Sequence, residues 1–403
     1  MKRFAVFIFV TLCAHGGAGA DTVLVADFRA ERDTLSLGLP YLVARVLNNV
    51  SGCQAILPDA PPQDVVARLY DTEGMPEFNE AARLRVEAGA DRILLGRAAP
   101  SGAPGASTVF FYLAGADGSR PEAFGADIAE DGCIPALAEW AAGKIAPAPA
   151  RTPPPMPPAL LPVFSRGLRL LRAADPERAA RALPADAHPR NADVRFLLGR
   201  AAALRRKPYA ALQLFTEATN LDPSFASPAY REGLLWASLD RPSLAEAAFD
   251  RAARIQPSFF EALLESGILK TARGDFAAAE GTLRRALAMR PISAEARYRL
   301  ADCLARAGRE NQARALLADL VEARRDLGPA RLLLARLLFQ AGDYAAAEAQ
   351  ARAAARLMPN DPDARTLLAD ALSRQGGYNR HAEAAVQLQR AIWLRERGAG
   401  AAP

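Results

Sequence analysis

A period of 34 residues governs the second half of this chain, and no other feature restricts its fold as strongly. Five series of positions repeat at this period, and nearly all of their members are glycine, alanine or proline. The series are Gly199, Gly233, Gly267, Ala301, Ala335 and Ala369; Ala211, Ala245, Ala279, Ala313 and Ala347; Ala218, Ala252, Ala286, Leu320 and Ala354; Pro223, Pro257, Pro291, Arg325 and Pro359; and Gly274, Gly308, Gly342 and Gly376. A shared period of this length is typical of stacked repeats in which each unit covers the apolar face of its neighbour.

The residue types of the series fit a pair of antiparallel helices in each repeat. Small side chains at repeat positions 8 and 20 allow the two helices to cross closely. Glycine at position 15 lets the chain turn, and proline at position 32 ends the second helix. The pattern predicts full repeats at 192–225, 226–259, 260–293, 294–327 and 328–361, a sixth from 362 with about three extra residues around 378–383, and a degenerate unit before them with helices at 163–174 and 176–183.

The second half of each repeat carries a motif that points to a known family. Ala211, Phe215, Ala218 and Pro223 reproduce the A-x3-F, A and P pattern, so the region resembles the tetratricopeptide repeat (TPR) family, although the tryptophan at position 4 is missing. The resemblance implies an all-α solenoid over 159–397 whose first helices line a concave, peptide-binding groove. The groove residues that it implies are Phe196, Arg200, Tyr230, Tyr298, Asp302, Arg306, Arg336, Phe339 and Arg374.

An aromatic-plus-arginine groove of this kind suits extended or helical peptides, with arginine available for carboxylates. The alternative is that some of the aromatic side chains simply pack between repeats. The Asn/Lys carboxylate clamp of chaperone-binding TPR domains is missing, so capture of a chaperone C-terminus is not expected.

Residues 21–145 differ from the repeats in charge and in pattern. Their net charge is −8, whereas residues 146–403 carry +11. Strand patterns at 22–28, 54–57, 92–96 and 107–114 alternate with helical patterns, which predicts a small α/β domain. The predicted helices follow Pro40 as far as Val50 and cover 64–69, 76–88 and 134–145.

The segment Ala88-Gly-Ala-Asp-Arg-Ile-Leu-Leu-Gly96 gives this front domain a second resemblance. Together with 23–28 and 110–118, it resembles the N-terminal domain of TolB-like periplasmic proteins in kind and order. The resemblance implies a fold of two domains in the α+β class, a TolB-like α/β domain followed by the TPR solenoid. The propeller that follows this domain in TolB is absent, so no TolB partner is expected from it.

The first twenty residues read as a secretory signal peptide. Lys2 and Arg3 precede an almost unbroken apolar run of ten residues and an Ala-Gly-Ala exit, which predicts cleavage before Asp21 and a periplasmic location. Ten apolar residues are too few to span a bilayer, so no integral membrane span is expected. A lipoprotein is the less favoured alternative, because Leu12 rather than a small residue precedes Cys13.

Export also bears on the cysteines and on the joint between the domains. Oxidation after export makes a Cys53–Cys133 disulfide possible, with two buried thiols as the alternative, and Cys303 reads as a small core residue. Seven prolines within 146–158 predict an extended linker, and 398–403 predict a frayed tail. The opposed net charges leave open whether the two domains dock on each other, and they suggest that salt would separate them.

The remaining motifs argue against catalysis. The two histidines of the mature chain lie in distant units, and no metal-binding spacing or phosphate-binding loop occurs, so we expect no enzyme site, no metal site and no cofactor. Arginines spread over every repeat predict solvated faces and i,i+4 pairs rather than a nucleic-acid surface. The chain is therefore predicted to be an exported, periplasmic TPR scaffold that binds an envelope protein or peptide. The alternative is that the front domain recognises a glycan or small ligand, with the repeats as an adaptor.

Overall fold

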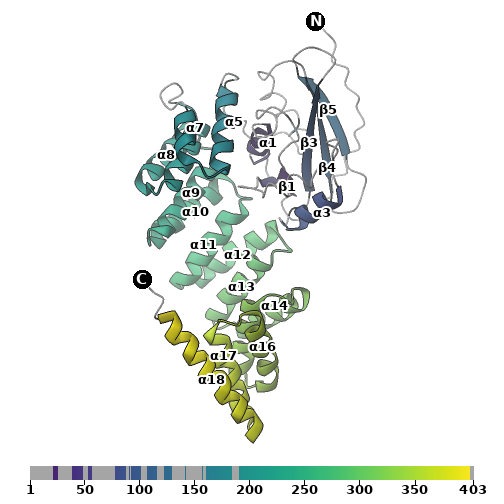
Figure 1. Ribbon diagram of the computed structural model, residues 1–403, viewed down its shortest axis with the longest axis vertical. Coiled ribbons are helices and arrows are strands. Elements are labelled where there is room, and N and C mark those ends of the chain that lie inside the picture. Colours follow the sequence, from purple (N-terminus) through teal and green to yellow (C-terminus); the bar gives the residue numbers. More distant parts are fainter. Residues whose placement is uncertain are drawn as a thin grey trace. The chain divides into compact units, whose positions relative to one another are not determined.

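The computed structural model describes residues 21–25, 39–48, 53–56, 78–87, 90, 92–100, 107–115, 122–128, 141, 157, 160–183 and 190–399 (Figure 1). The chain divides into two compact units. The first unit holds residues 1–266 with 288–291, and the second holds 267–287 with 292–403. The predicted signal peptide and helix 64–69 lie outside the described residues. So do nearly all of helix 134–145 and of the linker, and the last four residues of the tail.

The front domain contains a five-stranded mixed sheet in the order β2-β1-β3-β4-β5. The strands are β1 (Asp21–Val25), β2 (Cys53–Ile56), β3 (Arg92–Pro100), β4 (Ser107–Ala114) and β5 (Glu122–Ile128). β1 is parallel to both β2 and β3, whereas β3, β4 and β5 are antiparallel. β3 is longer than the predicted 92–96 because the β4 ladder continues from Ile93 to Pro100.

Helices cover both faces of this sheet, as side-chain alternation along the strands requires. Leu94, Val109, Phe111 and Leu113 share a core with α1 (Leu39–Leu47). The alternate residues share another core with α3 (Phe78–Glu87), which contains Ile93, Leu95, Tyr112, Ala114, Ala81 and Leu84. The predicted α/β layering of the front domain is therefore present in the described residues.

The helical part begins with a short pair, α5 (Leu161–Arg172) and α6 (Pro176–Ala182), at the place of the predicted degenerate unit. The first helices of the six following pairs are α7 (Ala192–Leu204), α9 (Ala226–Ser238), α11 (Phe260–Arg273), α13 (Ala294–Arg306), α15 (Gly328–Gln340) and α17 (Pro362–Gln375). The second helices are α8 (Pro208–Leu221), α10 (Pro242–Ile255), α12 (Phe276–Met289), α14 (Glu310–Ala323), α16 (Tyr344–Leu357) and α18 (Tyr378–Ala399). Each first helix starts at a predicted repeat boundary, which confirms the 34-residue register.

The last helix departs from the pattern in length. α18 begins in register, yet it has 22 residues, whereas α16 has 14. Ala384 and Ala391 are buried at 4% and 0% exposure, in the phase expected after three extra residues. The extra residues are therefore accommodated inside the first turns of α18.

The turns within the repeats show why glycine recurs at position 15. Gly274, Gly308 and Gly342 have φ values of +88°, +75° and +84°, which side chains rarely adopt. The first two full repeats lack this glycine, and Arg206 and Asp240 take the same conformation at φ of +55° and +56°. The turn geometry is thus imposed by the repeat even where the residue disfavours it.

The small residues at position 8 mark the closest approach between paired helices. A Cβ atom on Gly199 would lie 2.5 Å from the Phe215 ring, and one on Gly233 would lie 2.5 Å from the Phe249 ring. In the second unit, a Cβ atom on Gly267 would lie 2.6 Å from the Leu283 side chain. The predicted helix crossing is therefore present, with the position-24 side chain filling the space that glycine leaves.

Candidate functional site

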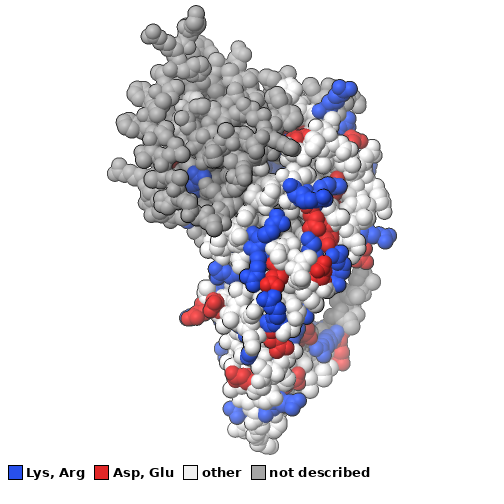
Figure 2. Space-filling view, turned by 180° about the vertical axis from the view of Figure 1, so that it is seen from behind, with Lys and Arg blue, Asp and Glu red and all other residues white. Residues whose placement is uncertain are grey.

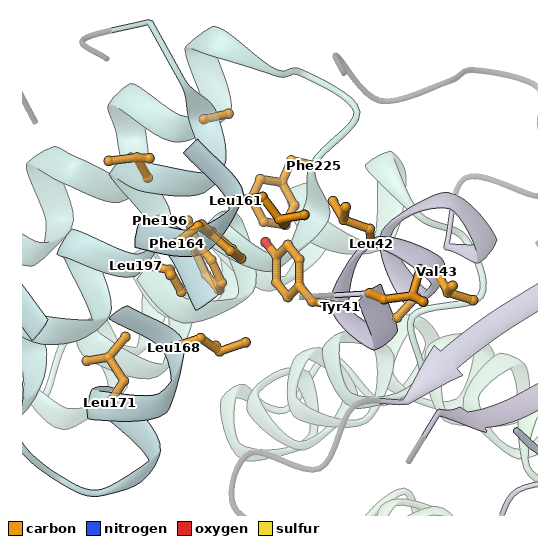
Figure 3. Packing of buried hydrophobic residues seen from close by; sticks show 14 of the residues in the cluster. Tyr41, Leu42, Val43, Leu161, Phe164, Leu168, Leu171, Phe196, Leu197 and Phe225 are labelled. Atoms are coloured by element: carbon orange, nitrogen blue, oxygen red, sulfur yellow. The ribbon is translucent and has the colours of Figure 1, made fainter. Parts of the chain in front are cut away.

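Helix α1 of the front domain is embedded between its own sheet and the first repeats. All nine of its residues are buried, and all except Pro40 and Arg45 join a single cluster with Leu161, Phe164 and Leu168 of α5 and with Phe196 and Leu197 of α7. Figure 3 shows the Tyr41 ring directed into this cluster, among Leu161, Phe164 and Phe225. The Tyr41 and Phe164 ring centroids are 4.8 Å apart.

The polar contacts of α1 follow one stripe of the helix. Tyr41, Arg45 and Asn48 are spaced i, i+4 and i+7, so they project from the same side. All three hydrogen-bond to the repeats: Tyr41 and Arg45 to Asp193, and Asn48 to Gln256. The front domain thus docks on the repeats through α1 within the first unit.

Arg45 is the centre of this contact. Its Nε donates to Asp193 Oδ1 at 3.0 Å, and its Nη2 donates to Asp222 Oδ2 at 2.5 Å. The guanidinium carbon lies 3.6 Å from the centroid of the Phe225 ring, a cation–π geometry. The Tyr41 hydroxyl donates to the same Asp193 oxygen at 2.8 Å.

The ion pairs are almost entirely withdrawn from water. The side chains of Arg45, Asp193 and Asp222 are 7%, 9% and 4% exposed. Burial raises the pKa of the Asp222 carboxyl, but Arg45 and Ser224 outweigh it and the pKa lies below its ordinary value. Burial and the neighbouring Asp193 carboxylate raise the pKa of Tyr41 well above 10.0. At neutral pH, Arg45 is therefore protonated, Asp222 is ionised and the Tyr41 phenol is neutral.

The contacts use equivalent places in successive repeats. Asp222 caps the end of α8, and Gln256 caps the end of α10, which is 34 residues further on. Gln256 Nε2 donates to Asn48 Oδ1 at 3.0 Å. Because Arg45 and Asn48 contact the same position of two successive repeats, the contacts fix where α1 lies along the repeats.

The predicted groove residues of the first unit lie partly beneath this contact. Phe196 is 5% exposed and packs between the rings of Phe215 and Phe225, at 5.9 and 4.9 Å. Tyr230 is half-buried between Phe249 and Phe259, at 5.6 and 5.0 Å. Arg200 is half-buried, and its charge opposes only in part the rise that burial causes in the pKa of Tyr41. Both aromatic rings therefore pack against two other rings of their own repeat.

The predicted groove residues of the second unit are more accessible. Tyr298 is half-buried with the Arg299 guanidinium 5.5 Å from its ring, and Asp302 pairs with Arg306 at 3.1 Å. Phe339 is half-buried, 5.2 Å from the Tyr344 ring. Arg336 and Arg374 are exposed on first helices, and within residues 190–399 neither has a hydrogen bond or ion pair.

The charged surface is mixed rather than basic. Figure 2 shows Lys and Arg interspersed with Asp and Glu along the repeats on the face in view. Charged residues four positions apart form ion pairs within individual helices. Examples are Arg284–Glu280, Arg299–Glu295 and Arg352–Glu348, whose nitrogen–oxygen distances are 2.9, 2.6 and 2.8 Å. The predicted i,i+4 pairing of arginines is therefore present in several helices of the repeats.

The described residues contain no group of three or more His, Cys, Asp or Glu side chains placed to hold a metal ion. Cys303 is a buried free thiol whose pKa is raised by burial, as expected for a core residue. Among the described helices, none combines the length and apolar character needed to cross a bilayer. The predicted Cys53–Cys133 bridge lies outside the described side chains.

Comparison with known proteins identifies the repeats. Models of the tetratricopeptide repeat family match residues 270–337 and 332–402. No curated protein matches the chain. Together with the spacing of the helices, the family matches confirm TPR repeats in the helical part. Neither match reaches the front domain, so the predicted TolB-like character has no support from them.

Solved structures with a likeness to this chain include three repeat proteins. A tetratricopeptide repeat protein from Parabacteroides merdae is 18% identical, with 58% of this chain and 91% of that chain covered, at a TM-score of 0.45. PilW, a widely conserved type IV pilus biogenesis factor, is 23% identical, with 51% and 96% covered, at 0.43. YrrB, a TPR protein with an unusual peptide-binding site, is 21% identical, with 45% and 92% covered, at 0.38.

The docking residues were not among the candidates that the sequence yielded. Arg45 interrupts an otherwise apolar helix, Leu39–Leu47, and a lone charge in such a segment is a usable sign of a buried partner. Asp193 stands at repeat position 2, which the TPR resemblance places on the inner surface. Sequence alone does not connect the two, because 148 residues separate them.

Proposed function

We propose that the protein is an exported, non-enzymatic scaffold that binds a peptide or protein of a cell-envelope assembly through its repeats. The observation that carries the proposal is a pair of exposed arginines on first helices of the second unit, Arg336 and Arg374, which have no hydrogen bond or ion pair within residues 190–399. Arg336 is also close enough to the half-buried Tyr298 to interact with it electrostatically. Arginine without an internal partner is available to pair with a carboxylate, and tyrosine offers apolar area with a polar tip.

The finer features of the proposal rest on the sequence. The signal peptide at 1–20 would deliver the chain to the periplasm, where a Cys53–Cys133 bridge could form. Residues 21–145 would form a TolB-like domain, joined through the linker at 146–158 to the solenoid at 159–397. The presence of TPR repeats supports protein binding as the general role.

The test uses the full mature chain as bait in an envelope extract, with captured proteins identified by mass and then purified for direct binding. We expect Tyr298→Ala with Arg336→Ala to weaken binding of the purified partner at least tenfold. The matched control is Tyr209→Ala with Arg356→Ala, the same residue types exposed on second helices α8 and α16. Equal loss in both double variants, or no loss in the first, would reject the groove of the second unit as the binding surface.

A further inference from the structure

The contact between α1 and the repeats has the form of a ligand in a receptor. Its polar part is one arginine side chain, held from two sides by carboxylates and from a third by an aromatic ring. The receptor residues Asp193, Asp222 and Phe225 all belong to the repeats, whereas the arginine comes from the front domain. We call these three repeat residues the guanidinium pocket.

The repeats supply all three residues of the pocket and hold two of them in place. Asp193 lies in the first turn of α7, where Asn191 caps the helix, and Asp222 is held at the end of α8 by Ser224, which donates to it through both its hydroxyl and its amide. The Phe225 ring is fixed at 4.9 Å from the Phe196 ring. Asp222 and the Phe225 ring are thus held by residues of the repeats, whereas the Asp193 carboxylate is placed by its helix and receives hydrogen bonds from Tyr41 and Arg45 of α1.

The pocket is selective for a guanidinium rather than for any cation. Nε and Nη2 donate in different directions to two separate carboxylates, which requires a planar group with several fixed donors. The flat face of the same group covers the Phe225 ring at 3.6 Å. A lysine ammonium, as a compact point charge, could not satisfy both carboxylates and the ring from one position.

We propose that Asp193, Asp222 and Phe225 form a binding site for an arginine side chain presented on a helix, and that α1 is its resident ligand. The ligand class is a helix with an aromatic residue four positions before the arginine, as in Tyr41 and Arg45, because Tyr41 fills the adjoining apolar space against Phe164. A partner helix with this spacing competes with α1 for the first repeat. While α1 is bound, the front domain keeps such a partner out of the first repeat.

The first test is chemical rescue in the full chain. Arg45→Ala removes the atoms of an ethylguanidinium ion from a site whose other walls remain in place. We expect 20 mM ethylguanidinium to raise the Tm of Arg45→Ala by several degrees, with no rise for the wild type and none with ethylammonium. Arg45→Ala combined with Asp193→Asn and Asp222→Asn should lose the rescue. Rescue of the triple variant, or none in Arg45→Ala, overturns the proposal.

The second test remains informative if Arg45→Ala is too unstable to melt cleanly. A labelled peptide of residues 38–50 is titrated against the full wild-type chain and against Tyr41→Ala with Arg45→Lys, which retains the charge but vacates the ring contact. We expect at least tenfold tighter binding to the variant and loss of that binding when the peptide carries Arg45→Lys. Equal affinity for both chains, or indifference to the peptide's arginine, refutes a guanidinium site.

Discussion

Replacing Gly233 by alanine tests whether the small residue at position 8 sets the distance between paired helices. In an ordinary helix, Gly→Ala stabilises the fold by about 1 kcal/mol, because alanine has the higher helix propensity. At Gly233 the new Cβ would meet two ring carbons of Phe249 at 2.5 Å, whereas carbon atoms in contact lie about 3.5–4.0 Å apart. The ring or the backbone must therefore move by about 1 Å.

The Phe249 ring has little space into which it could move. It is 1% exposed, and its centroid lies 5.6 Å from that of Tyr230. Overpacking of this kind costs about 1–3 kcal/mol, which cancels or exceeds the propensity gain. We therefore expect Gly233→Ala to be destabilising by up to about 2 kcal/mol.

Gly281 provides the matched control within the same protein. It lies inside helix α12 and is exposed, and a methyl carbon added to it would have no neighbour within 4 Å. Gly281→Ala should therefore stabilise by about 1 kcal/mol. Native-state hydrogen exchange is the appropriate assay, because it reports a free energy of opening for each helix and does not require two-state unfolding.

The chain itself suggests the compensating change. Glycine stands opposite phenylalanine in the pairs Gly199–Phe215 and Gly233–Phe249, whereas alanine at position 8 occurs with a smaller residue at position 24, as in Ala301 and Leu317. Gly233→Ala combined with Phe249→Leu should therefore recover stability relative to the sum of the single changes. If Gly233→Ala stabilised α9 as much as Gly281→Ala stabilises α12, the crossing argument would be wrong.

Three further outcomes follow from individual residues. Arg206→Gly should stabilise the first full repeat by about 1 kcal/mol in urea unfolding, since it removes a side chain from φ of +55°; a loss of stability would show that the turn is not strained. Because the pKa of Asp222 is lowered, its ionised carboxylate stabilises the docked state fully above pH 3.8, and this stabilisation is lost as the pH falls through the folded-state pKa. Acid should therefore separate the front domain from the repeats in scattering experiments, and Asp222→Asn should abolish this pH dependence. Burial raises the pKa of Glu232 above 4.5, so Glu232→Gln should stabilise at pH 7 by under about 1 kcal/mol, and this gain should vanish as the pH falls below 4.5.

The repeats could be predicted from the sequence because their constraints are local and recur. Each glycine, alanine or proline of a series acts within one helix pair, so the 34-residue register fixes every helix start from Ala192 to Pro362. Four of the five described front-domain strands were also predicted, because segments such as Ser107–Ala114 are largely apolar, whereas the mixed sequence of β5, Glu122–Ile128, gave no such signal. Where a glycine is absent, as at Arg206, the repeat still imposes the turn.

The docking of α1 could not be predicted in the same way, because it depends on contacts between distant segments. Arg45 finds its partners 148 and 177 residues away. The TPR resemblance placed Phe196 in an open groove, whereas its ring packs between Phe215 and Phe225. A family pattern specifies which side of a helix faces inward, but it does not specify what the rest of the chain places there.

The docking contact also reverses the charges that the composition suggests. The front domain carries net −8 and residues 146–403 carry net +11, yet the buried ion pairs join an arginine of the acidic domain to aspartates of the basic region. Net charge acts over distances that salt screens, with a Debye length of about 10 Å at 0.1 M salt, whereas groups 4–9% exposed are shielded from that screening. A lack of expansion in salt is therefore the result expected of a docked chain, contrary to what the net charges alone suggest.

The radius of gyration of the full chain should stay constant between 0.05 and 0.5 M salt. It should increase for Arg45→Ala at both salt concentrations, because removing the arginine leaves two buried carboxylates without their ion pair. Expansion of the wild type with salt would mean that surface attraction, and not the guanidinium pocket, holds the front domain in place.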